Sequence, residues 1–179
     1  GTDVFGDLSS AGFGGLAEYA CAPESALALK PINLSYEEAA AVPLAATTAL
    51  QALRNVAQVQ PGQRVLIYGA SGGVGTYAVQ IAKAFGAEVT AVCSTSKVDT
   101  ARALGADHVI DYTREDFSRS GRTYDVILAV NGNRKLADYG RALTPTGTYV
   151  MAGGESSQLF EALLIGPLKT KRGGKAFRN

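Results

Sequence analysis

A loop rich in glycine, in the first half of the chain, has the composition of a phosphate-binding site. Residues 64–75 run Arg-Val-Leu-Ile-Tyr-Gly-Ala-Ser-Gly-Gly-Val-Gly, so an apolar stretch ends in a loop that contains four glycines. Where such a loop opens a helix, its bare backbone lets a pyrophosphate approach the unpaired N–H groups of the first helical turn. The residues expected to bind the pyrophosphate of a dinucleotide are Ala70, Ser71, Gly72, Gly73, Val74 and Gly75.

The residues on both sides of this loop predict the strand and the helix that would position it. Val65–Ile67 is a continuous apolar run of the kind that is buried on both faces of a parallel sheet. From Val74 to Phe85 the apolar residues recur at helical spacing, and Gly86 stands where a C-terminal glycine cap belongs. The order strand, glycine turn and helix therefore indicates a dinucleotide-binding βαβ unit.

The glycine spacing by itself leaves two classes of enzyme open. Gly73-x-Gly75, with Ala78 in the third place, matches the second half of the dinucleotide fingerprint, and Gly69-x-x-x-Gly73-x-Gly75 matches the short-chain reductase version. The short-chain reductase interpretation is disfavoured because the sequence contains no Tyr-x-x-x-Lys pair. A tight turn without a chemical role is the structural alternative to both.

The end of the second predicted strand indicates which dinucleotide is bound. A free ribose 2′-hydroxyl is usually held there by an acid, but this chain continues Cys-Ser-Thr-Ser-Lys from Cys93 to Lys97. Hydroxyls and an ammonium group suit a 2′-phosphate through charge-assisted hydrogen bonds, which predicts NADP(H). In the alternative, Lys97 is a solvated surface residue and Ser96 caps the next helix.

The remainder of the chain alternates strands and helices, which predicts an α/β fold with a doubly wound parallel sheet. Residues 1–29 instead predict short β pieces, and residues 114–122 a solvated helix or loop. The other predicted strands are Asp3–Gly6, Leu16–Cys21, Glu88–Cys93, His108–Ile110, Tyr124–Val130 and Gly147–Met151, and the other predicted helices are Ser35–Val42, Leu44–Val56, Val98–Leu104, Arg134–Leu143 and residues 158–165.

The composition is that of an ordinary globular protein. The 179 residues carry a net charge of +1 and are 46% hydrophobic, so neither a nucleic-acid surface nor a disordered chain is indicated. No apolar stretch reaches membrane-spanning length and no signal peptide is recognisable, so we expect no membrane partner and a cytoplasmic location. The single histidine and the two distant cysteines, Cys21 and Cys93, predict neither a disulfide nor a metal site.

From Leu16 to Gly154 the sequence resembles the medium-chain dehydrogenase/reductase superfamily, and within it the zinc-free, NADPH-dependent quinone oxidoreductase branch. The resemblance is carried by Glu18-Tyr19, the run Glu38 to Pro43 with Thr47-Thr48-Ala49, Pro61-Gly62, Ala70 to Gly75 and Gly105-Ala106-Asp107. It implies a GroES-like catalytic domain, with residues 1–32 as its last strands, and a Rossmann cofactor domain over residues 33–155. Residues 156–179 would be a helix and a truncated edge strand, and the chain would be a fragment whose intact form is a homodimer through that sheet edge.

The resemblance also implies roles for individual residues. Thr47 would lie beside the nicotinamide, Ser94 and Lys97 would meet the 2′-phosphate, and Tyr112 would lie along the adenosine. The loop after the Tyr124 strand, with Asn131 and Gly132, would line the nicotinamide ribose, although relatives commonly have an aspartate followed by Val-Gly there.

The resemblance implies a zinc-independent oxidoreductase that transfers a hydride from NADPH to a quinone or to an activated alkene or carbonyl. Pro43 stands where zinc-dependent relatives place a cysteine, which disfavours a zinc alcohol dehydrogenase. A non-catalytic NADPH-binding protein is the alternative from another class. The resemblance implies that these 179 residues alone bind the cofactor weakly and do not turn over.

Overall fold

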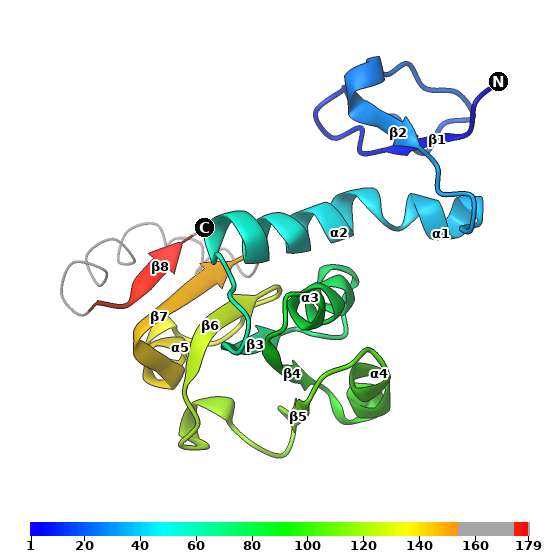
Figure 1. Ribbon diagram of the computed structural model, residues 1–179. Coiled ribbons are helices and arrows are strands. Elements are labelled where there is room, and N and C mark those ends of the chain that lie inside the picture. Colours follow the sequence, from blue (N-terminus) through cyan, green and yellow to red (C-terminus); the bar gives the residue numbers. More distant parts are fainter. Residues whose placement is uncertain (154–173, 179) are drawn as a thin grey trace. The chain divides into compact units, whose positions relative to one another are not determined.

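A six-stranded parallel sheet organises the larger of two structural units in the computed structural model, which describes residues 1–153 and 174–178. The units are Gly1–Thr47 and Thr48–Asn179. The sheet has the order β5-β4-β3-β6-β7-β8, which is the strand order of a Rossmann fold (Figure 1). Its strands are β3 (Arg64–Tyr68), β4 (Glu88–Cys93), β5 (His108–Asp111), β6 (Tyr124–Ala129), β7 (Leu143–Met151) and β8 (Ala176–Arg178). The predicted doubly wound parallel sheet is confirmed.

Helices cover both faces of this sheet, because each strand of its centre is apolar on both sides. On one face, α3 (Gly73–Ala84) and α4 (Val98–Ala103) contribute Ala78, Val79 and Ala101 to a buried core. On the other face, α5 (Leu136–Ala142) buries Leu136, Tyr139 and Ala142. The two cores hold the carboxyl ends of β3, β4 and β6 in fixed positions beside one another.

Several predicted boundaries are shifted by a few residues. The helix predicted to begin at Arg134 begins at Leu136, and the strand predicted over Gly147–Met151 already begins at Leu143. The pairing of β6 with β7 changes register between Tyr124 and Val126, an irregularity that the periodicity of β6 does not indicate. None of these shifts moves the carboxyl ends of the strands.

The polar stretch after β5 is mostly exposed over residues 114–122, as predicted, but it contains one buried aromatic residue that the prediction missed. A 3-10 turn, Phe117–Arg119, places Phe117 at 2% exposure in the core. The Phe117 ring centroid lies 5.6 Å from that of Tyr68 and 5.4 Å from that of Tyr139. Because only one apolar side chain of the stretch points inward, the sequence shows no periodic pattern from which the burial of Phe117 could be predicted.

The smaller unit consists of a two-stranded antiparallel ribbon and a helix. Strand β1 (Val4–Gly6) pairs with β2 (Leu27–Leu29), which follows a 3-10 turn at Glu24–Ala26. The predicted strand Leu16–Cys21 is wrong: these residues form turns and extended coil, and Leu16 and Tyr19 are exposed. In the part of the chain that the structure describes, no strand pairs with these residues, and an isolated strand is not stable by itself.

Helical residues follow the ribbon. The helix α1 (Tyr36–Ala40) begins at a capping box, in which the Ser35 hydroxyl accepts from the Glu38 N–H and the Glu38 carboxylate accepts from the Ser35 N–H. The next helix, α2 (Pro43–Leu50), begins in unit Gly1–Thr47, crosses the boundary at Thr48 and continues as π-helical turns at Gln51–Val56. Both predicted helices are present in this part of the chain.

The helix predicted over residues 158–165 lies outside the described residues, and the domain boundaries at residues 32 and 155 stay predictions. Strand β8 is formed where the edge strand was expected. Within the described ranges, no helix has the length and apolarity needed to cross a membrane.

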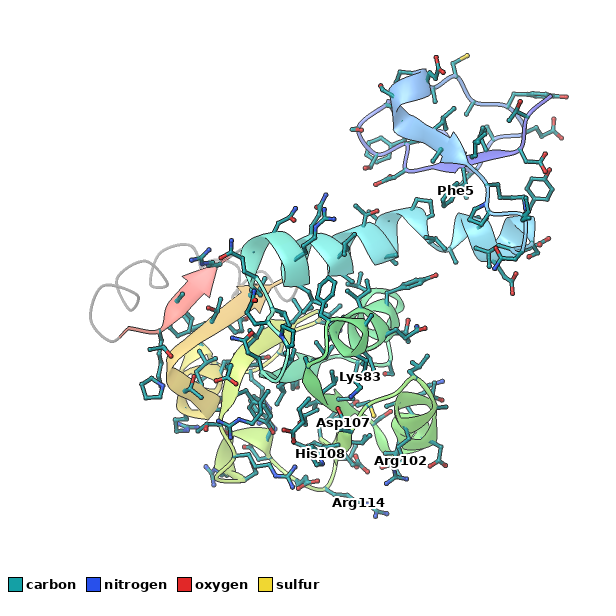
Figure 2. The ribbon with its side chains drawn as sticks, in the orientation of Figure 1. Phe5, Lys83, Arg102, Asp107, His108 and Arg114 are labelled. Atoms are coloured by element: carbon teal, nitrogen blue, oxygen red, sulfur yellow. The ribbon has the colours of Figure 1, made fainter. Side chains whose placement is uncertain are left out.

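An ion pair at the amino end of β4 and β5 couples the stability of this unit to pH. The Lys83 ammonium lies 2.7 Å from Asp107 Oδ1, and the Val89 N–H donates to Asp107 Oδ2 at 2.7 Å (Figure 2). Burial alone would raise the pKa of the Asp107 carboxyl, but these two donors together hold it below its ordinary value.

We therefore expect Asp107→Asn to lose less stability on acidification than the wild type. A carboxyl whose pKa is lowered by folding stabilises the protein above the pKa of the unfolded chain, and this stability is lost as the pH falls through the folded pKa. Urea unfolding at pH 7 and at pH 3 measures the loss for both proteins. Equal losses in the two proteins would show that Asp107 does not contribute to the acid sensitivity.

Candidate dinucleotide-binding site

The glycine loop brings the start of α3 into direct contact with the end of β3. Gly69 has a φ of +81°, a conformation that favours glycine, and the N–H groups of Gly69 and Ala70 both donate to the Val92 carbonyl, at 3.2 and 3.1 Å. A Cβ at Gly75 would lie 2.1 Å from the Gly69 carbonyl oxygen and 2.8 Å from Ala70 Cα. Only glycine at position 75 therefore permits this close packing of helix on strand.

The first turn of α3 is open to an anion. Gly72 occupies the N-cap position without a side-chain cap, and the first helical hydrogen bond runs from the Thr76 N–H to the Gly72 carbonyl at 2.9 Å. The N–H groups of Gly73, Val74 and Gly75 therefore have no acceptor within the helix. Since residues 71–73 are exposed, this turn combines unpaired donors, the positive end of a helix dipole and solvent access. The structure thus gathers all six residues predicted in the loop around one helix N-terminus.

The loop after β4 presents hydroxyls and an ammonium group without an acid. The Ser94 and Ser96 hydroxyl oxygens lie 3.4 Å apart, and the Lys97 N–H donates to the Ser94 carbonyl at 2.9 Å. Lys97 itself is exposed and occupies the N-cap position of α4, where no side chain makes a capping hydrogen bond. The alternative in which Ser96 caps this helix is wrong, so the Ser96 hydroxyl is not used for that purpose.

A buried carboxylate that the sequence interpretation missed lies under this loop. Asp111, at the end of β5, is 9% exposed and accepts the Thr95 hydroxyl at 2.5 Å and the Thr113 hydroxyl at 2.7 Å. The Thr95 hydroxyl, assisted by the Thr113 donors and the Arg114 guanidinium 3.6 Å away, holds the pKa of this carboxyl below its usual range despite burial. The Thr95 bond spans 16 positions of the chain, so no local pattern could have predicted it.

Tyr112 follows directly and is accessible. Its side chain is 48% exposed, while its N–H donates to the Cys93 carbonyl at 3.1 Å. The backbone bond places Tyr112 beside the end of β4, on the same edge as Ser94. This position is compatible with the contact to adenosine that the sequence predicts for its ring.

The end of β6 borders the glycine loop at the point where the strand order reverses. The chain leaves β3 for β4 and β5 on one side and returns to β6 on the other, which is the topological switch point where α/β sheets bind ligands. A Cβ at Gly69 would lie 3.3 Å from the Asn131 nitrogen, and the Val130 N–H donates to the Tyr68 carbonyl at 3.0 Å. Asn131 is exposed, so its side chain is accessible to a ligand, whereas Gly132 is buried and has no side chain to offer.

Tyr68 and Asn133 stabilise this loop, and neither was predicted. The buried Tyr68 hydroxyl donates to Asn133 Oδ1 at 2.5 Å, and burial raises the pKa of this phenol. In the sequence, Tyr68 cannot be told apart from the apolar residues of β3 that precede it. Its role in holding the loop after β6 becomes visible only from the position of its hydroxyl at the end of β3.

Thr47 lies in the other structural unit. It is exposed on α2 and lines a pocket of about 340 Å³ together with Phe5, Asp7 and Pro43. Its predicted place beside the nicotinamide stays a prediction.

The donors in the described part of the chain do not form a zinc site. No group of three His, Cys, Asp or Glu side chains that could hold a metal ion occurs in residues 1–153 and 174–178. The His108 ring instead contacts the Glu88 carboxylate at 2.7 Å, Cys93 is buried in the core and Cys21 is exposed in the other unit.

The strand order and the glycine-loop helix define a nucleotide-binding domain of the Rossmann class. The family model described as zinc-binding dehydrogenase matches residues 73–172. The chain belongs to this family, and with it to the medium-chain dehydrogenase/reductase superfamily.

Among the curated relatives, a 2-methylene-furan-3-one reductase of Solanum lycopersicum is 44% identical over 145 residues, which are 76% of this chain and 37% of the relative. The chloroplast envelope quinone oxidoreductase homolog of Arabidopsis thaliana is 43% identical over 72% of this chain and 42% of the relative. The solved quinone oxidoreductase from Coxiella burnetii superposes with a TM-score of 0.76 at 32% identity, covering 90% of this chain and 50% of that protein. The chain thus spans half or less of the length of each of these relatives.

Proposed function

We propose that this chain carries the NADPH-binding domain of a zinc-independent oxidoreductase that transfers a hydride to a quinone or to an activated alkene or carbonyl. The observation that carries the proposal is one continuous edge of the sheet, which presents an open helix N-terminus beside an acid-free loop with Ser94 and Lys97. The first feature suits a pyrophosphate and the second a 2′-phosphate. The relatives include a quinone oxidoreductase homolog and an NADPH-dependent alkenal/one oxidoreductase. Their names support NADPH as the cofactor and a quinone or an activated alkene or carbonyl as the substrate class.

In this proposal the protein binds and orients, because hydride chemistry is supplied by the nicotinamide when it is bound. The N–H groups of Gly73, Val74 and Gly75 hold the pyrophosphate, and Ser94 and Lys97 hold the 2′-phosphate. Tyr112 packs along the adenosine, and the loop of Asn131 and Gly132 lines the nicotinamide ribose through the exposed Asn131. Thr47 is proposed to help place the nicotinamide ring, as the resemblance to the family implies.

The test of the reaction class is NADPH oxidation by the whole protein with a simple quinone and with an α,β-unsaturated ketone. The proposal predicts turnover that survives treatment with a metal chelator. Turnover that is lost on chelation and restored by Zn²⁺ would favour a zinc alcohol dehydrogenase. Tight NADPH binding without turnover of either acceptor would favour a non-catalytic NADPH-binding protein.

Replacing Lys97 with alanine is expected to weaken NADPH binding by about tenfold and to leave NADH binding within about twofold, because a charge-assisted contact to phosphate is worth on the order of 1.5 kcal/mol. Titration of both cofactors by isothermal calorimetry measures the two dissociation constants. The matched control is Arg102→Ala, which removes the same charge from the same helix, where Arg102 pairs with Asp99 at 3.1 Å. Equal weakening of NADPH binding by both substitutions would mean that the effect is one of net charge alone.

We also propose a homodimer formed through β8. In the described residues this strand pairs with β7 along one side and ends the sheet order, so its other side is an edge on which a second copy could add. Size-exclusion chromatography with light scattering of the whole protein tests the dimer.

The proposed location is the cytoplasm, although chloroplast and mitochondrial relatives occur.

A further inference from the structure

The carboxylate of Asp111 connects the two loops that follow β4 and β5. The Thr95 hydroxyl, from the loop after β4, donates to Asp111 Oδ2 at 2.5 Å. The Thr113 N–H and hydroxyl, from the loop after β5, both donate to Asp111 Oδ1, at 3.0 and 2.7 Å. One carboxylate therefore fixes the loop that carries Ser94 and Lys97 to the loop that begins with Tyr112.

The three hydrogen bonds to Asp111 differ in the sequence separation of the residues that they join. The two bonds from Thr113 are local, because Thr113 is two positions from Asp111 in the chain. The Thr95 bond crosses from one strand end to the next, between residues 16 positions apart. The Thr95 hydroxyl also lies 3.0 Å from the Thr113 hydroxyl, so Thr95 joins the loop of residues 94–97 both to the end of β5 and to the loop that follows it.

The surroundings of Asp111 also exclude it as the acid that holds a ribose 2′-hydroxyl. Both of its oxygens already accept hydrogen bonds within the protein, and its side chain is 11% exposed. The Arg114 guanidinium, 3.6 Å from Oδ2, offsets its negative charge, and Figure 2 shows the Arg114 side chain projecting outward from the loop after β5. A buried and internally satisfied carboxylate can order a phosphate-binding loop without offering acceptors to the ligand.

We infer that Asp111 is a positioning residue which, through Thr95, holds the Ser94–Lys97 loop in the shape that accepts a 2′-phosphate, and so contributes to the preference for NADPH over NADH. This inference rests on the proposed function. The preference for NADPH then depends on the Thr95–Asp111 hydrogen bond beneath the loop as well as on Ser94 and Lys97 at its surface. Asp111 and Thr95 act through Ser94 and Lys97 and do not touch the ligand themselves.

The decisive substitution is Thr95→Val, because replacing Asp111 would change the loop and the local charge together. Valine keeps the branched shape and the charge balance and removes only the hydroxyl that reaches Asp111. We expect NADPH binding to weaken by about tenfold and NADH binding by less than about twofold, since a hydrogen bond to a charged group is worth on the order of 1.5 kcal/mol. The matched control is Thr113→Val, which removes a hydroxyl from the same carboxylate and its 3.0 Å contact with the Thr95 hydroxyl but keeps the Thr95–Asp111 bond. It should leave the ratio of the two constants unchanged.

A readout without cofactor separates this inference from the proposed function. Amide hydrogen exchange of the apo protein should become several-fold faster at Ser96 and Lys97 in Thr95→Val and stay unchanged there in Thr113→Val. Faster exchange with an unaltered NADPH to NADH ratio would overturn the inference while the proposed function stands, provided that the wild type prefers NADPH. Equal weakening of both cofactors would also overturn it, because that result indicates a general structural role. A wild type that binds NADH as tightly as NADPH would count against the cofactor assignment itself.

Discussion

Replacing Gly75 with alanine is expected to destabilise the Thr48–Asn179 unit by about 3 kcal/mol or more and to abolish NADPH binding. The added methyl group would overpack the core against backbone atoms, which cannot rotate away as a flexible side chain can. The added Cβ would lie 2.1 Å from the Gly69 carbonyl oxygen and 2.8 Å from Ala70 Cα. Both partners are backbone atoms, so relief requires α3 to move away from β3. That movement would displace the N–H groups proposed to hold the pyrophosphate. Urea unfolding and calorimetric titration with NADPH measure the two effects.

Gly72→Ala is the matched control for this prediction. A Cβ at Gly72 would lie 3.6 Å from the same carbonyl oxygen, which is an ordinary contact, and Gly72 has a φ of −82° that alanine adopts readily. We expect this substitution to cost less than about 1 kcal/mol, the difference between glycine and alanine at an N-cap. If Gly75→Ala were as stable as Gly72→Ala, the close packing of α3 on β3 would be wrong.

Phe117→Ala is expected to lower the free energy of unfolding by about 3–5 kcal/mol, as large core aromatics do when truncated. The ring is 2% exposed and packs between the rings of Tyr68 and Tyr139. Its removal would leave a cavity beneath the end of β3 and loosen Tyr68, whose hydroxyl holds Asn133. The shift of the urea midpoint measures the destabilisation.

Tyr112→Ala provides the comparison from the same polar stretch. Its ring is 48% exposed, so we expect its loss to change stability by less than about 1 kcal/mol. The two aromatic residues cannot be ranked from the sequence, since each stands alone among polar neighbours. A small effect of Phe117→Ala would contradict the burial of this segment.

Local patterns were sufficient to predict the central part of the fold. The apolar run of β3, the helical spacing of α3 and the glycines at 86 and 105, which take φ values of +78° and +98°, all act within a few residues of the chain. The carboxyl ends of parallel strands share one edge, so the six loop residues and the Ser94 to Lys97 segment could be placed together before the structure was known.

Features that depend on distant partners were missed. The Thr95–Asp111 and Tyr68–Asn133 bonds join residues 16 and 65 positions apart, so neither leaves a periodic signal. Leu16–Cys21 shows the opposite error, since its alternation suggested a strand but no strand among the described residues pairs with it. Periodicity predicts which residues can form an element, and tertiary pairing decides whether they do.

The most direct test of the central claim is a paired titration of the wild-type protein with NADPH and with NADH under the same salt conditions. The acid-free loop at Ser94 and Lys97, beside the open N-terminus of α3, predicts that NADPH binds at least about tenfold more tightly, as one charge-assisted phosphate contact provides. Raising the salt concentration should narrow this difference, because it screens the contact with the 2′-phosphate. NADH binding that equals or exceeds NADPH binding would contradict the account.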